Sequence, residues 1–382
     1  MNILLVTPFF PDHGGGIEKV AEQIARRLAF SGDRILWFAG DTDPPPESRP
    51  PGLDCLAVGC WNVAEQRFGF PWPLWSFGAL LALWRAIGQS DAVHIHDALY
   101  PGCLAACLFA RWRRRFLLLT QHVAEVPYRS RLLRSLHRLA NRTLGRWVIG
   151  RSDQVVFVSP AVRDHFAVFC RFRRPPRHIA NGLDGETFAT ADANTQALER
   201  QHAGGDPARP LLIFVGRFVE KKGLPLVLEL ARRLPGVNWV LVGPGRLPST
   251  VLPLPGHVQT YFDATSSQVA ALFRQADVLV LPSLGEGFPL VVQEALACGT
   301  AVLTTPETAA GAPAAAPWIF TEERLDDGCD ADRWIAHLVA LLTDLPALRA
   351  MRPDRGMAAR QLWSWERTAT EYRSIFTPEK RS

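Results

Sequence analysis

The chain is short of lysine, and its acidic residues are unevenly placed. Of 42 basic residues only Lys19, Lys221, Lys222 and Lys380 are lysines. Residues 1–181 hold 23 basic and 14 acidic side chains, a net charge of +9, whereas residues 182–382 hold 19 and 23, a net charge of −4. The net charge of +5 is therefore the sum of a positive first half and a negative second half, and we expect the two halves to face different partners.

Other absences exclude whole classes of protein. The seven cysteines are odd in number and contain no CxxC pair, which argues against a disulfide framework or a zinc site. The start MNILLVTPFF has no basic region before its apolar residues, so we expect a first strand rather than a signal peptide. The longest uncharged run, 17 residues between Arg67 and Arg85, contains Pro71 and Pro73 and is too short to span a bilayer. These features predict a cytoplasmic protein.

The fold class follows from alternating strand and helix patterns. With 48% hydrophobic and 21% charged residues, the chain is globular, and 382 residues favour two domains. Apolar runs of strand length alternate with helical segments, a pattern typical of a parallel sheet covered on both faces. The expected strands are Asn2–Val6, Arg34–Ala39, Ala92–Ile95, Phe116–Thr120, Gln154–Val158, Leu211–Val215, Trp239–Val242, Val278–Leu281 and Ala301–Leu303.

The alternation pauses once, which places the domain boundary. Residues 182–209 are rich in Gly, Ala, Asp and Thr and are typical of a linker. We therefore predict two doubly wound α/β domains, residues 1–185 and 208–356, joined by a linker over 186–207. The end of the chain, 357–382, contains a predicted helix over Met357–Phe376. Ligands of such sheets bind beyond the carboxyl ends of the strands, so residues just after each strand are the candidates for function.

In the first half, glycines and histidines follow the expected strands. Gly14, Gly15 and Gly16 precede a helix with Glu18 in its first turn, an arrangement that suits an anion but also suits a simple turn. The spacing is not GxGxxG, which counts against a nicotinamide enzyme. At two further strand ends stand His94, His96, Asp97 and His122. We interpret His94 as structural and expect His96 and His122 to converge on one crevice.

In the second half, basic residues gather after a strand. Gly216 and Arg217 follow the strand Leu211–Val215, and Lys221 and Lys222 come just before a helix. Arginine offers a bidentate fork to phosphate and lysine a compact charge, although a solvated basic loop is the alternative. Gly243 follows the next strand and permits either a close backbone approach or a turn.

Two glutamates eight residues apart flank a predicted helix that begins near Pro289. Glu286 lies in the loop after the strand Val278–Leu281, and Glu294 follows about two helical turns into the helix. Ionised carboxylates accept paired hydrogen bonds from sugar hydroxyls, and the free amides at the helix start suit phosphate or hydroxyl oxygens. The pair therefore indicates a sugar-binding crevice.

In chain order these segments resemble the motifs of retaining glycosyltransferases with the GT-B fold, glycosyltransferase family 4. The similar segments are GGGIEK, HIHD, TQHV, VVFVSPAV, IANGLD (with Ala180 where proline is usual), VGRFVEKKG, LVGPG, LPSLGEGFPLVVQEALACGTAV and LWSWE. The resemblance covers nearly the whole chain. It implies two Rossmann-like domains facing a central cleft, with the acceptor on the first domain, the nucleotide-sugar on the second, and the C-terminal helix crossing back to the first.

The resemblance also implies a role for each matching residue. Arg217 and Lys222 are expected to hold the diphosphate, Glu294 the ribose hydroxyls and Glu286 a hydroxyl of the donor sugar. With His122 beside the reacting centre, the catalytic set is His122, Glu286, Arg217 and Lys222, and His96 and Asp97 lie on the acceptor side. The implied donor-binding residues are Gly15, Gly16, Arg217, Lys222, Gly243, Glu286, Gly287, Phe288, Pro289, Leu290, Val291 and Glu294.

The implied chemistry needs no metal or other cofactor, and no metal constellation stands out in the sequence. Retaining transfer by front-face attack requires no protein nucleophile, and electrostatic groups stabilise the developing charge. One stretch departs from the family pattern. After the strand Ala301–Leu303 the family has a glycine pair, a glutamate and an Asn/Asp-Gly turn, whereas this chain has Thr304-Thr305-Pro306-Glu307-Thr308 and an Ala/Pro run. We expect this segment, 304–320, to alter the rim of the donor site and hence the choice of sugar, and a weakened or inactive member of the family stays an alternative.

The positive charge of the first half is concentrated in residues 111–151, which hold eleven arginines and one acid, Glu125. Arginines there surround leucines in an amphipathic helical pattern: Arg129, Arg131, Arg134, Arg138 and Arg142 with Leu132, Leu133, Leu136 and Leu139. Three interpretations compete: leucines packed in the core, nucleic-acid binding, and attachment to an anionic membrane. No nucleic-acid module is visible, and we favour attachment to the membrane surface.

Together these features predict a hexosyltransferase that moves a sugar, with retention, from a UDP- or GDP-sugar to a lipid-linked saccharide or lipid A core. This places it in bacterial envelope polysaccharide or lipopolysaccharide synthesis, peripheral on the inner face of the plasma membrane. The alternatives are a nucleotide-sugar epimerase of the same fold and a non-catalytic scaffold with a degenerate donor site.

Overall fold

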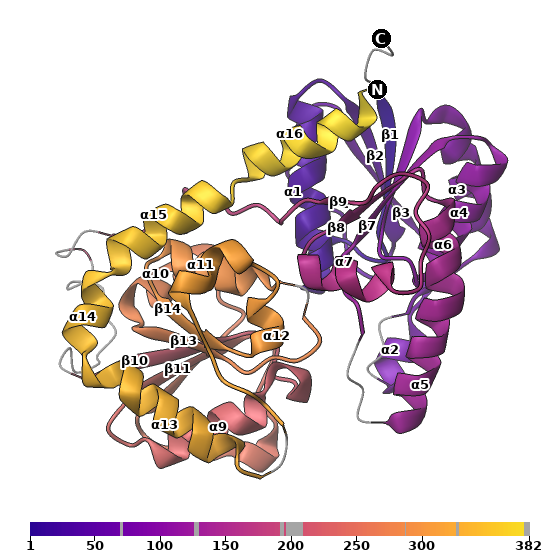
Figure 1. The fold of residues 1–382 in the computed structure, drawn as a ribbon. Helices are drawn as coiled ribbons and strands as arrows, with labels where there is room; N and C mark the ends of the chain where they lie inside the picture. Colours follow the sequence, from indigo (N-terminus) through magenta and orange to yellow (C-terminus); the bar gives the residue numbers. More distant parts are fainter. Residues whose placement is uncertain are drawn as a thin grey trace. The chain divides into compact units, whose positions relative to one another are not determined.

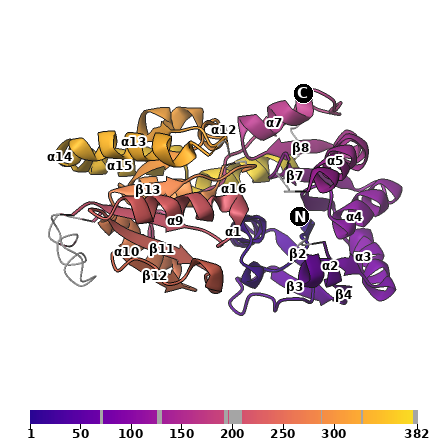
Figure 2. The same cartoon turned by 90° about the horizontal axis from the view of Figure 1, so that it is seen from below.

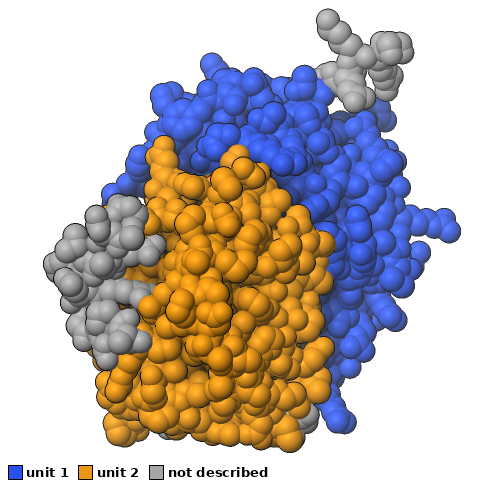
Figure 3. All heavy atoms as spheres, turned by 60° about the vertical axis from the view of Figure 1, so that its left-hand side comes forward, with its two compact units in different colours: residues 1–182, 365–382 blue, residues 183–364 orange. Residues whose placement is uncertain are grey.

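The computed structural model describes residues 1–68, 72–125, 130–191, 195, 209–286, 288–325 and 328–377. The chain forms two compact units, Met1–Gly182 with Trp365–Ser382 and Leu183–Ser364 (Figure 3). Each unit is built on a parallel sheet, which confirms the predicted α/β class with two doubly wound domains. Most of the predicted linker, residues 192–194 and 196–207, lies outside the described residues.

The sheet of unit 1 has the strand order β3-β2-β1-β6-β7-β8-β9, and its described pairs are parallel (Figure 1). Strand β1 lies inside the sheet, with Leu4 paired to Leu36 on one side and Val93 on the other. The strands are β1 (Asn2–Val6), β2 (Arg34–Gly40), β3 (Leu53–Val58), β6 (Ala92–His96), β7 (Phe116–Gln121), β8 (Gln154–Phe157) and β9 (Arg177–His178), with a separate antiparallel pair β4 (Cys60–Trp61) and β5 (Leu74–Trp75).

Helices pack on this sheet through apolar residues at helical spacing. Helix α1 buries Val20, Ile24 and Leu28, and it lies beside α16 from the other end of the chain (Figure 1). The helices of unit 1 are α1 (Gly16–Phe30), α2 (Val63–Phe68), α3 (Phe77–Gln89), α4 (Pro101–Trp112), α5 (Arg131–Ala140), α6 (Arg146–Arg151), α7 (Pro160–Ala167) and α16 (Trp365–Phe376), with the short turns η1 (Pro11–His13) and η2 (Asn141–Gly145).

The sheet of unit 2 has the order β12-β11-β10-β13-β14-β15. Its strands are β10 (Leu211–Val215), β11 (Asn238–Gly243), β12 (Val258–Phe262), β13 (Val278–Leu281), β14 (Ala301–Thr304) and β15 (Ile319–Thr321). Its helices are α9 (Leu224–Arg233), α10 (Ser266–Gln275), α11 (Leu290–Ala297), α12 (Pro306–Ala309), α13 (Asp330–Thr343), α14 (Leu345–Ala350) and α15 (Arg352–Leu362), with the turns η3 (Glu220–Lys222), η4 (Ser249–Val251) and η5 (Pro313–Trp318).

The prediction of one helix over Met357–Phe376 is wrong, because the chain is extended at Trp363 between α15 and α16. Trp363 packs against Phe288, with ring centroids 5.4 Å apart, and belongs to unit 2. Trp365 packs so closely on Gly182 that a Cβ at that glycine would collide with it, and it belongs to unit 1. The two tryptophans are thus held by different units, which interrupts the helix between them.

Both strand orders contain a switch point, where neighbouring strands are followed by connections that run in opposite directions. In unit 1 it lies between β1 and β6, and in unit 2 between β10 and β13. Such points leave a crevice beyond the carboxyl ends of the two strands. The predicted glycine loop and His96 follow the first pair, whereas Arg217, Lys222 and Glu286 follow the second.

Among the described residues, no single helix has the length and apolarity to cross a membrane. One bent pair, Asp330–Thr343 with Leu345–Phe376, meets the criteria of length and composition when taken together.

Candidate functional site

At the switch point of unit 2, the predicted lysines meet the predicted glutamate. The Lys222 ammonium lies 3.0 Å from Glu286, and that of Lys221 lies 3.5 Å from the same carboxylate. Burial raises the pKa of the Glu286 carboxyl, but attraction to Lys222 and Lys221 outweighs it, so the pKa lies below its usual range. Glu286 is therefore ionised at neutral pH and accepts hydrogen bonds.

The loop that carries Glu286 is held by neighbours on both sides. Backbone Leu284 donates to the Lys221 carbonyl at 3.1 Å, which fastens this loop to η3. The Arg324 guanidinium donates to the carbonyls of Glu220 and Pro282 at 3.3 and 3.0 Å, joining the same two loops. The spacing between the lysines and Glu286 is therefore fixed by the backbone as well as by their charges.

The segment that departs from the family pattern also holds the loop of Glu286 in place. Glu307, in α12, accepts a hydrogen bond from backbone Gly285 at 3.1 Å, directly before Glu286. Thr305 caps α12 and donates to the Ser283 carbonyl at 2.9 Å, and Thr304 donates to the Leu281 carbonyl at 2.7 Å. The Thr-Thr-Pro-Glu sequence thus builds a helix start that supports the loop after β13.

Three glycines let the loops of unit 2 approach one another. A Cβ at Gly243 would collide with the Gly216 carbonyl and touch the Phe218 ring, so the close approach there is to the protein's own backbone. Gly223 has a φ of 79° at the start of α9 and packs against Pro282. The structure thus explains Gly243 by packing, and its role as a donor-binding residue stays a prediction.

Helix α11 begins at Leu290, one residue later than predicted, because Pro289 adopts extended angles and forms the N-cap. Phe288 is buried against Trp363, which anchors the helix start. The side chains of Leu290, Val291 and Glu294 are partly exposed. Gly287 lies outside the described residues. The roles assigned to this segment stay predictions.

In unit 1 the glycine loop has open space beside it. A Cβ at Gly14 or Gly16 would meet no atom within 4 Å, whereas one at Gly15 would collide with the Glu18 carboxylate, which is buried. Gly15 is the N-cap of α1 and makes no side-chain cap. The buried Glu18 carboxylate thus lies at the start of α1, and the roles of Gly15 and Gly16 as donor-binding residues stay predictions.

The residue before these glycines is held in place by two acids. His13 lies with Nδ1 2.8 Å from Asp43 and Nε2 3.1 Å from Glu65, and its ring stacks on Phe9 at 3.7 Å. Sequence reasoning missed this support, because Asp43 and Glu65 lie 30 and 52 residues away along the chain.

The prediction that His96 and His122 converge is confirmed. His96 Nδ1 and His122 Nε2 share a hydrogen bond of 2.9 Å, and the rings stack with centroids 5.2 Å apart. Asp97, with a φ of 62°, accepts a hydrogen bond from the backbone of His122 at 2.7 Å. These three residues therefore form one rigid group at the ends of β6 and β7.

His94 continues this group into the interior, which agrees with its structural interpretation. Its Nε2 shares a hydrogen bond of 2.8 Å with Thr120, whose hydroxyl bonds the Tyr372 hydroxyl of α16 at 3.0 Å. Burial lowers the pKa of His94 and of His122 to about 3, and that of His96 well below its usual range. All three imidazoles are neutral at physiological pH.

The basic segment contains a helix with no buried side chain. In α5, Leu132, Leu133, Leu136 and Leu139 are 68%, 47%, 52% and 58% exposed. The interpretation that places these leucines in the core is therefore wrong. Arg131, Arg134 and Arg138 lie on the same exposed helix, whereas Arg129 lies outside the described residues. Figure 1 shows α5 at the lower edge of unit 1, in line with α6, and Figure 2 shows the same helix from below.

The described residues contain no group of three or more His, Cys, Asp or Glu side chains suited to hold a metal ion. The metal-independent reaction stays a prediction.

Sequence reasoning also missed that Arg324 and Glu307 hold the loop of Glu286 in place. A threonine followed by proline and glutamate after a strand is the signal that points to a capped helix there.

The chain matches two known families along most of its length: Glycosyltransferase Family 4 over residues 14–187 and Glycosyl transferases group 1 over residues 196–347. A protein of Mycobacterium sp. (strain JLS) named D-inositol 3-phosphate glycosyltransferase is 33% identical over 87% of this chain and 79% of its own length. A Segniliparus rotundus protein of the same name is 30% identical over 58% of this chain, and the match spans about half of that protein, 51%.

Solved structures share the fold at low sequence identity. Sucrose-phosphate synthase from Thermosynechococcus elongatus superposes with a TM-score of 0.78 at 18% identity, covering 98% of this chain and 99% of that one. Anabaena HepE in complex with UDP-glucose gives 0.75 at 16% identity over the same shares. The sequence and fold similarities therefore extend over both units.

Proposed function

The chain is a glycosyltransferase of the GT-B fold and belongs to glycosyltransferase family 4, and from this premise we propose that it transfers a sugar, with retention, from a UDP- or GDP-sugar to a lipid-linked saccharide or lipid A core. Transfer takes place at the cytoplasmic face of an anionic membrane, as a step of envelope polysaccharide synthesis. The proposal has a donor part and an acceptor part, which are supported by different observations.

The donor part is carried by the ionised Glu286 beside Lys222 at a switch point. In this proposal Lys222 and Arg217 hold the diphosphate, since arginine and lysine are the usual phosphate-binding side chains. Glu286 accepts a hydroxyl of the donor sugar and Glu294 accepts the ribose hydroxyls. HepE, a structural neighbour, is described in complex with UDP-glucose, which supports the choice of a nucleotide-sugar.

The chemistry follows from the charge states of these groups. Departure of the nucleoside diphosphate leaves negative charge on its oxygens, which Lys222, Arg217 and the amides before α11 stabilise. The acceptor hydroxyl attacks from the same face and passes its proton to the departing diphosphate oxygen. The new bond from the anomeric carbon to the acceptor oxygen replaces the bond to the diphosphate, and the product keeps the anomeric configuration. Neutral His122 donates or accepts one hydrogen bond beside the reacting carbon, and its pKa of about 3 excludes a role as a charged acid near pH 7.

The donor proposal is tested with the whole chain and a panel of UDP-, GDP- and ADP-sugars. Thermal shift identifies the donor, and calorimetry then measures its affinity for the wild type and for Glu294→Ala. Hydrogen bonds from ribose hydroxyls to a charged acceptor are worth about 1.5–3 kcal/mol each, so their loss lowers the affinity at least about tenfold. Unchanged affinity would show that Glu294 does not hold the ribose.

The acceptor part rests on the leucines of α5, which lie among arginines and are 47–68% exposed. An apolar stripe flanked by cations suits the headgroup region of an anionic bilayer. Each arginine near such a surface contributes about 1 kcal/mol. An enzyme held there meets acceptors whose lipid part stays in the bilayer.

Liposome flotation tests this part. The wild type binds vesicles containing phosphatidylglycerol at 0.1 M NaCl, and Arg134→Glu/Arg138→Glu binds at least tenfold less. The matched control is Arg232→Glu in α9, an arginine on a helix whose apolar residues are buried. Equal binding by the α5 variant and the wild type would refute this attachment.

A second candidate acceptor is a soluble phosphorylated cyclitol, which the name of the 33% identical mycobacterial relative favours. An acceptor panel separates the two: sugar appears on D-inositol 3-phosphate in one case and on a lipid-linked saccharide in the other. Transfer to the soluble acceptor at equal rates with and without vesicles would favour the cyclitol.

A further inference from the structure

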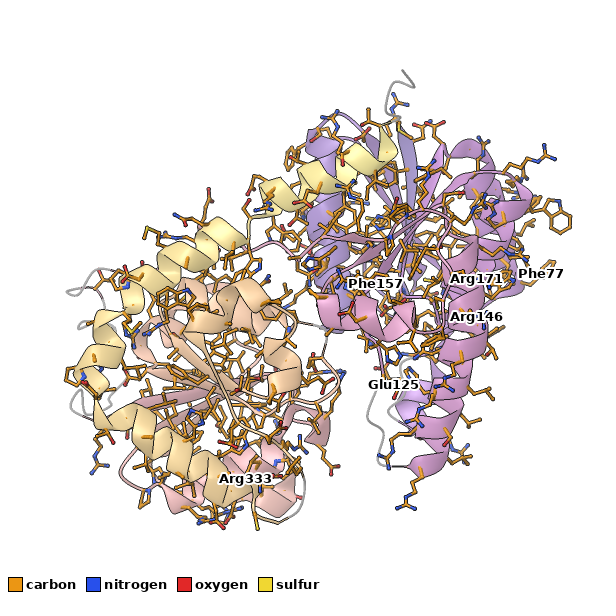
Figure 4. The ribbon with its side chains drawn as sticks, viewed as in Figure 1. Phe77, Glu125, Arg146, Phe157, Arg171 and Arg333 are labelled. Carbon is orange, nitrogen blue, oxygen red and sulfur yellow. The ribbon has the colours of Figure 1, made fainter. Side chains whose placement is uncertain are left out.

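Unit 1 exposes a second group of apolar side chains, separate from α5, on helices α3 and α4. Phe77 is 82% exposed and Trp112 is 74% exposed, with Leu81 and Leu108 at 41% and 48%. Figure 4 shows Phe77 on the outer side of unit 1. We call this surface the aromatic face, and its members are Phe77, Leu81 and Trp84 of α3 with Leu108, Phe109 and Trp112 of α4.

The aromatic face is continuous across the two helices. Phe77, Leu81 and Trp84 follow one another at spacings of four and three residues, so they lie along one side of α3. The Trp84 ring meets Phe109 at 5.3 Å and Trp112 at 5.7 Å between centroids, both edge to face. The rings therefore form one cluster, and large parts of Phe77 and Trp112 remain uncovered.

The charged side chains on the two helices are all basic, and one of them, Arg111, pairs with Asp153 at 3.1 Å. The Arg113 guanidinium lies 4.0 Å from the centroid of the Trp84 ring, a cation–π contact. Arg85 and Arg114 are exposed on the same two helices and the turn that follows them. Neither α3 nor α4 contains an acidic residue. The face therefore offers aromatic and apolar groups within a cationic rim.

The combination of aromatic rings and arginines indicates which kind of partner binds the aromatic face. A second copy of the chain docking face to face would bring two rims of arginine together, and like charges in contact are costly. An anionic lipid surface is complementary to it, because phosphates pair with the arginines while tryptophan and phenylalanine rings enter the interfacial layer. Isolated exposed apolar residues need no such explanation, but a contiguous cluster does.

We propose that the aromatic face is a second membrane anchor, which enters the interface of an anionic bilayer by burying rings rather than by charge alone. The inference rests on the proposed membrane-bound function and adds aromatic rings to the apolar contribution of the α5 leucines. Attraction between arginines and lipid phosphates is screened by salt, whereas burial of apolar surface, by the α5 leucines and by these rings, persists at high salt. Helix α6 contacts both α4 and η2, and η2 contacts α5, so both anchors lie on one connected layer of helices (Figure 1).

The test is flotation of the full chain with vesicles of phosphatidylglycerol and phosphatidylethanolamine at 0.1 and 1 M NaCl. We expect part of the wild-type binding to persist at 1 M NaCl, and Phe77→Ser/Trp112→Ser to lower this salt-resistant partitioning at least tenfold. Phe30→Ser is the matched control, since Phe30 is 73% exposed at the end of α1 but lies outside the cluster. Donor affinity by calorimetry verifies that each variant is folded.

The outcomes separate this proposal from the attachment through α5. If Arg134→Glu/Arg138→Glu abolishes low-salt binding but Phe77→Ser/Trp112→Ser binds like the wild type at 1 M NaCl, the aromatic anchor is refuted and the basic one stands. If only the aromatic variant loses binding, α5 is refuted instead. A concentration-dependent dimer in sedimentation, abolished by Trp112→Ser, would make the face a self-association surface and overturn the proposal.

Discussion

The switch points of the two units differ in charge although their folds are alike. In unit 1 the polar side chains are buried imidazoles that bond to each other and stay neutral. In unit 2 an ionised glutamate lies between two lysines. Because both sheets place these groups beyond strand ends, the difference comes from the side chains. The neutral site suits sugar hydroxyls, and the charged site suits a diphosphate.

The largest expected effect is acid destabilisation confined to unit 1. His94, His96 and His122 are neutral in the fold and take up protons when unfolded, so their contribution is complete above pH 6.5 and is lost as the pH falls toward 3. Each of the three histidines lowers the free energy of unfolding by about 1.4 kcal/mol per pH unit below 6.5, or by about 2 kcal/mol at pH 5. Hydrogen exchange at pH 7 and pH 5, corrected for intrinsic rates, measures this in β6 and β7.

Unit 2 is the internal control for this experiment. The pKa of Glu286 lies below its usual range, so its contribution is present above that range and is lost only at lower pH. Strands β10 and β13 are therefore expected to keep their protection at pH 5. Equal loss of protection in both units would contradict the assignment of neutral histidines to the core of unit 1.

Removing charge from the site of unit 2 is expected to have the next largest effect. Lys222→Ala leaves the Glu286 carboxylate facing the incoming diphosphate and removes a phosphate-binding cation. Such truncations cost about 2–3 kcal/mol, or roughly 30- to 150-fold in donor affinity. Lys221→Ala is the matched control, with a smaller loss because its ammonium lies 3.5 Å rather than 3.0 Å from Glu286.

Calorimetry at 0.05 and 0.3 M NaCl measures both lysine variants. Salt weakens wild-type binding because exposed charges are screened, and Lys222→Ala is expected to be less sensitive to salt. Equal affinity for the wild type and Lys222→Ala would remove this lysine from the donor site.

A smaller effect is expected at the neutral site. His122→Gln loses one hydrogen bond to an uncharged group, worth about 1 kcal/mol, so turnover falls about fivefold with little change in donor affinity. The ratio of mutant to wild-type turnover stays constant between pH 6 and 8, because the imidazole does not titrate there. A ratio that changes across this range would show that His122 carries a proton in the reaction.

The smallest effect is expected from the hydrogen bond by which Glu307 holds the loop of Glu286. Glu307→Gln keeps an acceptor for backbone Gly285 but replaces a charge-assisted hydrogen bond by a neutral one. We expect a loss of about 0.5 kcal/mol in donor affinity, or two- to threefold, and a larger loss for Glu307→Ala. Identical affinities for all three proteins would show that the loop keeps its place without this contact.

Local patterns predicted much of this molecule. Strands β1, β10 and β13 have the predicted bounds, and the histidines after β6 and β7 meet as their positions at strand ends implied. The start of α11 was misplaced by one residue, because Pro289 suits an N-cap as well as a first turn. Strand β3 was not anticipated, since Asp54 breaks its apolar run; it lies at the edge of the sheet, where Asp54, Leu56 and Ala57 are exposed.

Contacts between distant segments were beyond prediction. Nothing in the local sequence indicates that Glu307 holds Gly285, that Arg324 joins two loops, or that Tyr372 reaches Thr120 across 252 positions. Helices α5 and α9 are both rich in leucine and arginine, yet α9 buries Leu224, Leu228 and Leu230, whereas α5 buries none of its leucines. Periodicity reports which side of a helix is apolar and leaves open what covers that side.

The sequence by itself determined the fold class, the family and the positions of the candidate residues at strand ends, because these depend on short-range periodicity and motif spacing. The tertiary structure alone decided which candidates meet, which charges are compensated and which apolar surfaces stay uncovered. Strand order and packing bring together residues far apart in the chain, and burial then decides whether a histidine is neutral or a glutamate is charged.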